Sequence, residues 1–170
     1  YNAADGQCKV LPFAAFNTME QYTPRRPEAG FPEAFFFYPA QFWLHKNHVA
    51  LARAVSVLAE KYPEVHCVFS GDVNKNGYEP FCREVTRLGI EKHFTVLGYI
   101  EPEEIVWLYT HAMALVMPTF FGPTNIPPLE AMALGCPVII SDIYGLREQC
   151  ADAALYVAPA EPGDIAEKMA

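Results

Sequence analysis

The stretch AMALVMPTFFGPTNIPPLEAMALGCPVIIS, residues 112–141, decides the fold. It opens with an apolar run over 112–117, closes with another over 138–141, and has helical spacing of apolar residues over 126–134. Two apolar strands joined by a helix predict a βαβ unit, in which the strands run parallel and the crossover is right-handed. The first run is apolar throughout and the second is apolar up to Ser141, which is typical of strands that helices cover on both faces of the sheet.

The same alternation continues outward from this unit in both directions. The apolar pattern predicts helices at 49–59, 78–88, 102–111 and from 161 onward, and strands at 10–13, 34–38, 65–69, 94–97 and 155–157. Such alternation is typical of an α/β protein. We therefore expect a doubly wound, parallel, Rossmann-like sheet, with any ligand bound beyond the carboxyl ends of the strands.

Composition limits the classes of function to consider. The 170 residues are 52% hydrophobic and 19% charged, which predicts a folded domain with its own core. Because the net charge of −8 repels a phosphate backbone, no nucleic-acid partner is expected. The longest apolar run, 112–118, falls short of the roughly 20 residues that a membrane span needs. Five scattered cysteines without a C-x-x-C pair predict neither a zinc ribbon nor a disulfide framework, so we expect a reduced, cytoplasmic location.

The turn after the strand at 112–117 has the features of an anion site. Pro127 and Pro128 have no backbone N–H groups. The amides free to hold a phosphate at the start of the next helix therefore belong to Thr124, Asn125 and Ile126. The alternative is that Thr124 or Asn125 only caps the helix.

Two charged side chains stand out near these strand ends. Glu130 lies one turn inside the helix among apolar residues, where it is either on the solvent face or buried and paired. Its carboxylate is suited to accept hydrogen bonds from two ribose hydroxyls. Lys46 follows the strand at 34–38, where a phosphate would lie. His45 and His48 suggest a metal site, but no third ligand has a suitable spacing, so no metal is expected.

Glycine turns follow two further strands. Glycine lets a backbone approach a ligand closely, although Gly-Asp also forms ordinary turns. The residues of these turns are Ser70, Gly71, Asp72, Gly98, Tyr99 and Ile100. The chain has no P-loop, no G-x-G-x-x-G and no G-x-S-x-G, which disfavours NTP hydrolysis, NAD binding and α/β-hydrolase chemistry.

The motif EAMA at 130–133, followed by GCPVI at 135–139, resembles the signature of glycosyltransferase family 4. In that family a strand ending in Pro-Ser/Thr precedes a Glu-x7-Glu segment, then Glu-Ala-Met-Ala and Gly-x-Pro-Val-Ile. The loop at 38–46 stands where the family has its Gly-Arg…Lys-Gly loop, and 97–100 where it has Leu-Gly-x-Val.

This resemblance implies the C-terminal, donor-binding half of a GT-B enzyme. Residues 34–170 would form the nucleotide-sugar-binding domain, truncated at both ends, and residues 1–33 an interdomain link and flexible loop. The family transfers a sugar from a nucleoside-diphosphate sugar to an acceptor hydroxyl with retention of configuration, and needs neither a metal nor another cofactor. The donor would be a UDP- or GDP-sugar.

The resemblance also implies partners outside this chain. The acceptor would bind an N-terminal domain of the same enzyme, so this piece alone is expected to be inactive. Polysaccharide biosynthesis in the cytoplasm is the expected setting, with peripheral attachment of the whole enzyme to a membrane as an option.

Roles for individual residues follow from the same resemblance. Lys46 would neutralise the donor diphosphate and Glu130 would accept from the ribose hydroxyls, and both are expected to be catalytic. The expected donor-binding residues are Gln41, Lys46, Ser70, Gly71, Asp72, Gly98, Tyr99, Ile100, Gly122, Thr124, Asn125, Ile126 and Glu130.

The chain departs from the family pattern at two positions. Gly122 stands where the first glutamate of Glu-x7-Glu is usual, and Gln41 where the arginine is usual. Asn125 is our candidate for replacing that glutamate in holding the sugar hydroxyls. Phe120 is expected in the core. The competing hypotheses are a nucleotide-sugar epimerase-like GT-B domain, a non-catalytic nucleotide-binding α/β domain and an interaction module.

Overall fold

The described part of the chain is built of short strands and helices in alternation. The computed structural model describes residues 19–122 and 125–170. Its strands are β1 (Phe36–Pro39), β2 (Cys67–Ser70), β3 (Phe94–Val96), β4 (Ala114–Met117), β5 (Val138–Ser141) and β6 (Leu155–Val157). Its α-helices are α1 (His48–Ala59), α2 (Tyr78–Leu88), α3 (Pro102–His111), α4 (Ile126–Ala133), α5 (Leu146–Cys150) and α6 (Pro162–Met169). Short 3₁₀ turns lie at Met19–Gln21, Leu44–Lys46 and Glu91–His93.

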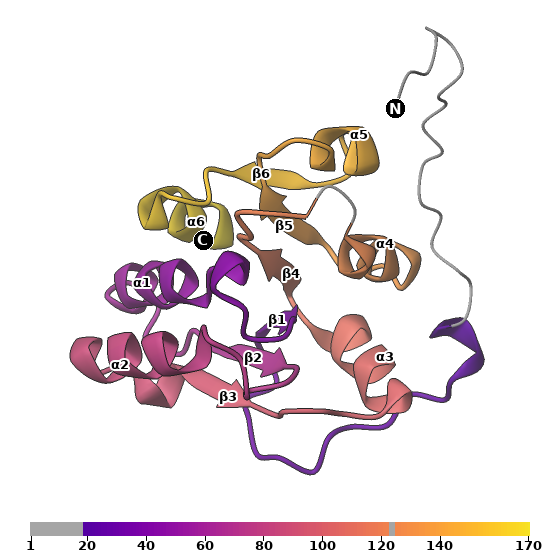
Figure 1. The fold of residues 1–170 in the computed structure, drawn as a ribbon. Helices are drawn as coiled ribbons and strands as arrows, with labels where there is room; N and C mark the ends of the chain where they lie inside the picture. Colours follow the sequence, from indigo (N-terminus) through magenta and orange to yellow (C-terminus); the bar gives the residue numbers. More distant parts are fainter. Residues whose placement is uncertain (1–18, 123–124) are drawn as a thin grey trace, which may run out of the picture.

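These strands pair into one sheet in the order β3-β2-β1-β4-β5-β6 (Figure 1). Every pair is parallel, and β1 pairs with β2 on one side and with β4 on the other. The strand order reverses between β1 and β4, and in doubly wound sheets a ligand binds at that point. The expected α/β, doubly wound fold is confirmed.

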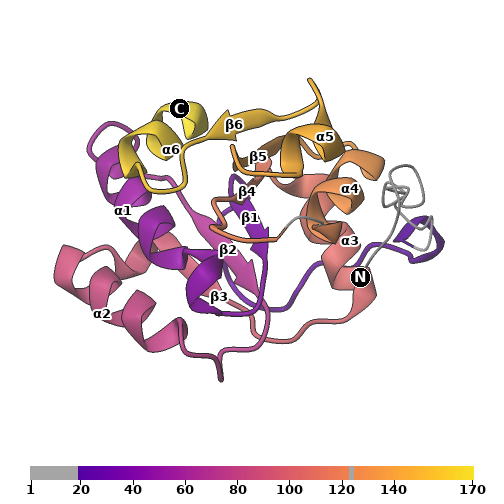
Figure 2. The same ribbon diagram turned by 45° about the horizontal axis from the view of Figure 1, so that its top comes forward.

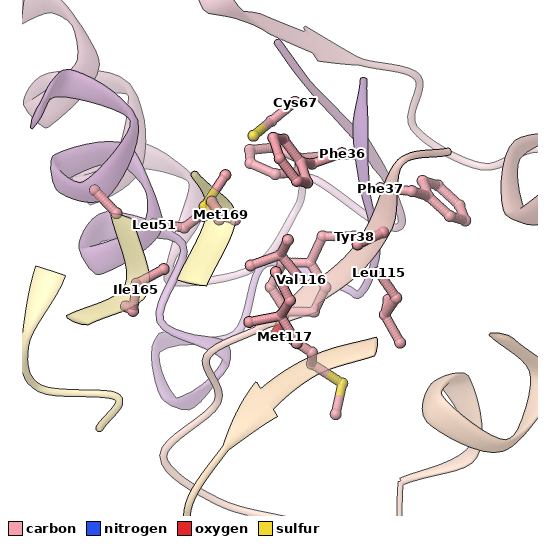
Figure 3. Close-up of a cluster of buried hydrophobic side chains, with 14 of the residues drawn as sticks. Phe36, Phe37, Tyr38, Leu51, Cys67, Leu115, Val116, Met117, Ile165 and Met169 are labelled. Atoms are coloured by element: carbon pink, nitrogen blue, oxygen red, sulfur yellow. The ribbon is translucent and has the colours of Figure 1, made fainter. Parts of the chain in front are cut away.

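Helices cover both faces of the sheet, with α1, α2 and α6 on one side and α3, α4 and α5 on the other (Figures 1 and 2). The side chains of β1 alternate between the two layers. The ring of Phe37 packs edge-on against Tyr109 of α3, with centroids 5.1 Å apart. The next ring, Tyr38, stacks on His48 of α1 at 4.8 Å. Figure 3 shows Phe37 and Leu115 pointing away from the side where Leu51 and Ile165 lie.

This two-sided burial explains why the central strands β1 and β4 consist of large apolar and aromatic residues. Phe37, Tyr38 and Leu115 are fully buried. Full burial of one such large apolar side chain stabilises a fold by roughly 1.5–3 kcal/mol. A polar group on either face of β1 or β4 loses its hydration and needs a partner, which the hydroxyl of Tyr38 has in the carbonyl of Lys46.

Local signals placed several helix ends correctly. Helix α2 ends at a left-handed C-cap, Gly89 (φ 66°), and α3 begins with Pro102 and a capping box between Glu101 and Glu104. Both helices occupy the predicted ranges. Helix α5 was not predicted, since its five residues are too few for helical periodicity to show. The predicted strand at 10–13 lies outside the described residues.

The segment before β1 packs along α3. The backbone N–H of Arg25 donates to the carbonyl of Glu103 at 3.1 Å. Phe31 is buried and packs edge-on against Phe35, with ring centroids 5.2 Å apart. The Arg26 guanidinium lies 5.3 Å from the centroid of the α3 side chain Trp107. The domain boundary near residue 33 stays a prediction.

A buried carboxylate joins α1 to α2. Glu84 of α2 accepts a hydrogen bond from Arg53 of α1 at 2.6 Å, and two more from Arg87 at 2.8 Å. The hydrogen bonds from Arg87 and Arg53 lower the pKa of Glu84 to about 2. Glu84 is only 9% exposed, so its charge depends on these two partners.

We expect Glu84→Gln to destabilise the fold by about 1 kcal/mol at pH 7, because it removes the charge that both guanidinium groups pair with. The loss is no larger because both guanidinium groups are largely exposed to solvent. The pKa of Glu84 is lower in the folded than in the unfolded state, so its contribution is full above the unfolded value of 4.5. That contribution disappears as the pH falls toward about 2. Urea unfolding of both proteins between pH 7 and pH ~2 measures this.

The matched control is Glu79→Gln on the same helix, where the exposed Glu79 pairs with the exposed Arg83. It should change the free energy of unfolding by less than about 0.5 kcal/mol at any pH. A difference between wild type and Glu84→Gln that did not shrink with falling pH would contradict the linkage.

Candidate functional site

The segments that follow β1 and β4 lie side by side at the carboxyl edge of the sheet (Figure 2). The carbonyl of His45 accepts from the backbone N–H of Phe120 at 2.7 Å and from the hydroxyl of Thr119 at 3.0 Å. Asn47, buried and left-handed (φ 60°), donates through Nδ2 to the carbonyls of Pro118 at 2.9 Å and Pro159 at 2.7 Å. Three crossover segments are thereby fixed to one another at the switch point of the sheet.

Lys46 lies inside this junction. Its carbonyl accepts from the hydroxyl of the buried Tyr38 at 2.9 Å, which ties the 3₁₀ turn to β1. Its Nζ donates to Oδ1 of Asn125 at 3.2 Å, so the ammonium reaches the N-cap of α4. The side chain is half-buried, and this burial lowers the pKa of Lys46. The fold therefore presents a positive charge with incomplete hydration at the start of a helix, where an anion is favoured.

Asn125 is held at both its side chain and its backbone. Its Nδ2 donates to the carbonyl of Gly122 at 2.6 Å. Its backbone N–H donates to Oε1 of Gln149 at 3.2 Å, and Nε2 of Gln149 donates to its carbonyl. The expectation that this N–H is free for a phosphate is therefore wrong, because Gln149 of α5 occupies it. Ile126, the first residue of α4, is 49% exposed, and Thr124 lies outside the described residues.

A side chain at Gly122 would need the Asn125 side chain to move and would strain the backbone. Its φ of 134° lies in a region that L-residues rarely adopt, and a Cβ there would come within 2.8 Å of the amide of Asn125. The glutamate expected here from the family pattern is therefore incompatible with the position that Asn125 takes. Both polar atoms of the Asn125 side chain already have partners, Lys46 and Gly122, so its predicted role toward the sugar stays untested.

Glu130 lies one turn into α4 and is half-buried. Its Oε2 accepts a hydrogen bond from the hydroxyl of the fully buried Tyr109 of α3 at 3.0 Å. Burial raises the pKa of Glu130, and the hydrogen bond from Tyr109 partly opposes this. Of the two environments considered from the sequence, the structure shows the paired one, with the side chain half-buried.

A second part of the candidate site is a shallow pocket of about 190 Å³ beyond β1, β2 and β3. Ile100 and Ile105 form part of its apolar wall. Six predicted donor-binding residues line it: Gln41, Ser70, Gly71, Gly98, Tyr99 and Ile100. Asp72 is not among the described residues that line it, and its carboxylate instead pairs with Lys75 at 2.7 Å.

Gly71 lets the backbones meet at this pocket. Its φ is 137°, and a Cβ would lie 2.5 Å from the carbonyl oxygen of Ala40. The N–H of Gly71 donates to the carbonyl of Gly98 at 2.7 Å, and that of Ala40 to Ser70 at 2.8 Å. The pocket floor is therefore main chain from three adjacent loops.

The two histidines near Lys46 have different surroundings. His45 is exposed, and its ring lies edge-on to Phe121. His48 is buried between Phe42 and Tyr38, with ring centroids at 4.0 and 4.8 Å. Burial lowers the pKa of His48 to about 3, so it serves as a neutral ring. Among the described residues, no three His, Cys, Asp or Glu side chains gather in a way that could hold a metal ion.

The expected core position of Phe120 is wrong, since its side chain is 50% exposed. The reason lies in the backbone, because Phe120 follows β4 in the loop that bonds to His45 and not in the sheet. Phe121 is 64% exposed and Trp43 is 40% exposed, whereas Phe42 is fully buried.

A cation beside a helix N-terminus, at the switch point of a parallel α/β sheet, is an arrangement that favours phosphorylated ligands. The profile of the family described as Glycosyl transferases group 1 matches residues 24–170, and the chain belongs to this family.

Among curated proteins, the chain is similar to the O-antigen chain mannosyltransferase RfbU of Salmonella typhimurium. The two are 32% identical over 128 residues, which is 75% of this chain and 35% of that protein. An uncharacterized glycosyltransferase of Methanocaldococcus jannaschii is 28% identical over 79% of this chain and 34% of its own length. The chain thus spans about a third of the length of these relatives.

Solved structures share the fold. Sucrose-phosphate synthase from Thermosynechococcus elongatus superposes with a TM-score of 0.75 at 23% identity, over 92% of this chain and 41% of that one. Anabaena Alr3699/HepE, crystallised with UDP-glucose, gives 0.71 at 20% identity, over 80% and 38%. The fold matches the C-terminal half of GT-B structures.

Two residues of the site were missed from the sequence, Gln149 and Tyr109. Both act on the predicted residues from other helices, at separations of 24 and 21 positions in the chain. No local spacing connects them to Asn125 or Glu130, so only a pairing of α3 and α5 with α4 could have found them.

No helix of the described residues is long and apolar enough to span a membrane.

We expect Tyr109→Phe to raise the pKa of Glu130, because it removes the hydrogen bond that favours the carboxylate while burial remains. The nearby thiol of Cys136 does not add a charge during this titration, because burial raises its pKa to about 11 and it stays neutral. NMR titration of the Glu130 side-chain carboxyl carbon measures the shift. An unchanged or lower pKa in Tyr109→Phe would show that this hydrogen bond does not act on the carboxylate.

Proposed function

We propose that the chain is the donor-binding domain of a retaining glycosyltransferase, which transfers a hexose from a nucleoside-diphosphate sugar to an acceptor hydroxyl. The observation that carries the proposal is the Nζ of Lys46, 3.2 Å from Oδ1 of Asn125 at the start of α4. A half-buried ammonium next to a helix N-terminus at the switch point of the sheet suits a diphosphate.

The remaining contacts of a nucleotide sugar fit the neighbouring features. Glu130, held from one side by Tyr109, has a second carboxylate oxygen to accept from ribose hydroxyls. The shallow pocket lined by Gly71 and Tyr99 would take the base against its apolar wall. The family relationship supports this arrangement, and Alr3699/HepE was crystallised with UDP-glucose.

Lys46 would act on the charge that develops during transfer. As the bond between the anomeric carbon and the diphosphate oxygen breaks, its electron pair stays on the leaving diphosphate. The ammonium of Lys46 and the N-terminal end of α4 would stabilise that charge. Because burial lowers the pKa of Lys46, a bound diphosphate would raise it again by supplying the missing counter-charge.

The acceptor and its binding groups would come from the part of the enzyme beyond this chain. Relatives named as O-antigen mannosyltransferases, including one from Salmonella typhimurium, support a polysaccharide acceptor and a place in polysaccharide biosynthesis. We place the enzyme in the cytoplasm, where nucleotide sugars are the donors, with peripheral attachment to a membrane as part of the proposal.

Calorimetric titration of the chain with UDP, GDP and ADP tests the donor role, and Lys46→Met is the decisive variant. It keeps most of the side-chain length but removes the charge, so we expect affinity for the diphosphate to fall about tenfold to a hundredfold. Lys61→Met, in the exposed turn that follows α1, removes the same charge elsewhere and should leave the affinity within about twofold.

Equal affinities of wild type and Lys46→Met would overturn the diphosphate role. A wild-type chain that binds none of the three nucleotides would contradict the donor-binding function itself. Binding of one nucleotide well above the others identifies the base.

Glu130→Gln tests the ribose assignment separately. The substitution keeps the shape of the side chain and removes its charge, so affinity for the ribonucleotide should fall by about tenfold. The 2′-deoxy form lacks one of the hydroxyls, and we expect a smaller loss with it. Equal losses for the two ligands, measured by the same calorimetry, would contradict contact between Glu130 and the ribose.

A further inference from the structure

A chain of hydrogen bonds runs from α5 to the ammonium of Lys46. The side-chain amide of Gln149 pairs with both backbone groups of Asn125, accepting from its N–H at 3.2 Å and donating to its carbonyl. The side chain of Asn125 then accepts from Nζ of Lys46 at 3.2 Å and donates to the carbonyl of Gly122 at 2.6 Å. Asn125 itself is only 5% exposed.

The two contacts of Gln149 restrain more than the position of Asn125. Asn125 is the N-cap of α4, with extended backbone (φ −119°, ψ 125°), so its backbone has no helical hydrogen bonds to fix it on the N-terminal side. Two amide contacts to one residue restrict its rotation as well as its displacement. They therefore fix the direction in which the side chain leaves the backbone, and the bonds of its own amide to Gly122 and Lys46 then place Oδ1.

We infer that Gln149 is a positioning residue for the diphosphate-binding lysine, acting through Asn125. The inference rests on the proposed function for the role of Lys46. Gln149 is half-buried on a helix of five residues, and its side chain bonds to the backbone of Asn125 and, among the described hydrogen bonds, not to Lys46. Its effect on a ligand is therefore indirect: it keeps Oδ1 of Asn125 facing Nζ, and so keeps the ammonium at the start of α4.

This assignment changes the role expected for Asn125. Each polar atom of its side chain already has one partner, and a side chain at Gly122 would displace it. An amide with one donor and one acceptor site already used has fewer to offer a sugar hydroxyl. The pairing supports a role for Asn125 in orienting Lys46.

A double-mutant cycle tests the inference in the 170-residue chain. Gln149→Leu removes both amide contacts with little change of size. We expect it to weaken binding of the diphosphate selected above by about three- to tenfold in the wild-type background. In the Lys46→Met background the same substitution should change the affinity by less than about twofold, because the group through which it acts is absent.

Arg147→Leu is the matched control on α5. Arg147 pairs with Asp142 and lies over Tyr156, away from Asn125, so its loss perturbs α5 without touching this chain of contacts. It should leave the affinity within about twofold. The amide of Asn125 provides a readout that needs no ligand, since its hydrogen exchange should become faster in Gln149→Leu and stay unchanged in Arg147→Leu.

The outcomes separate the two proposals. If Lys46→Met weakens binding but Gln149→Leu does not, or if their effects simply add, the role of Gln149 is wrong and the diphosphate role of Lys46 stands. If Lys46→Met has no effect, the proposed function fails first. Unchanged exchange at the Asn125 amide in Gln149→Leu would overturn the positioning role whatever the ligand does.

Discussion

The rest of the candidate site depends on the two hydrogen bonds that the side-chain amide of Asn47 donates. Its Nδ2 holds the carbonyls of Pro118 and Pro159, and so fixes the segments after β1, β4 and β6 relative to one another. The neighbouring Lys46 reaches Asn125 from this junction. A buried N–H without these acceptors would cost roughly 1–3 kcal/mol, which is why the junction is well specified.

The two charged groups of the site are both held in environments that disfavour their charge. Burial lowers the pKa of Lys46 and raises that of Glu130. A polar ligand that supplies an anion to one and hydroxyl donors to the other compensates both groups at once. Perturbed pKa values that occur together in one site are common where proteins bind ligands or carry out chemistry. The pKa of Glu84 moves in the opposite sense, because its two arginine partners favour the charged carboxylate.

Much of this architecture could be predicted from local sequence signals. Apolar runs identify β1 and β4 because both faces of the sheet are covered, and Gly89 and Pro102 place two helix ends. The position of Phe120 could not be predicted, since an aromatic residue beside a strand looks like core until the loop geometry is known. Gln149 and Tyr109 were missed for a different reason: each acts across helices, through tertiary contacts that have no period in the sequence.

The absence of a side chain at Gly122 has a consequence for the evolution of this fold. A Cβ at residue 122 and the amide of Asn125 compete for the same space, 2.8 Å apart. Glutamate at the first position therefore requires the asparagine side chain at the second to move aside and the backbone at residue 122 to accept a strained φ of 134°. Among homologous sequences these two positions should covary, because a change at one alters the space and the backbone conformation that the other needs.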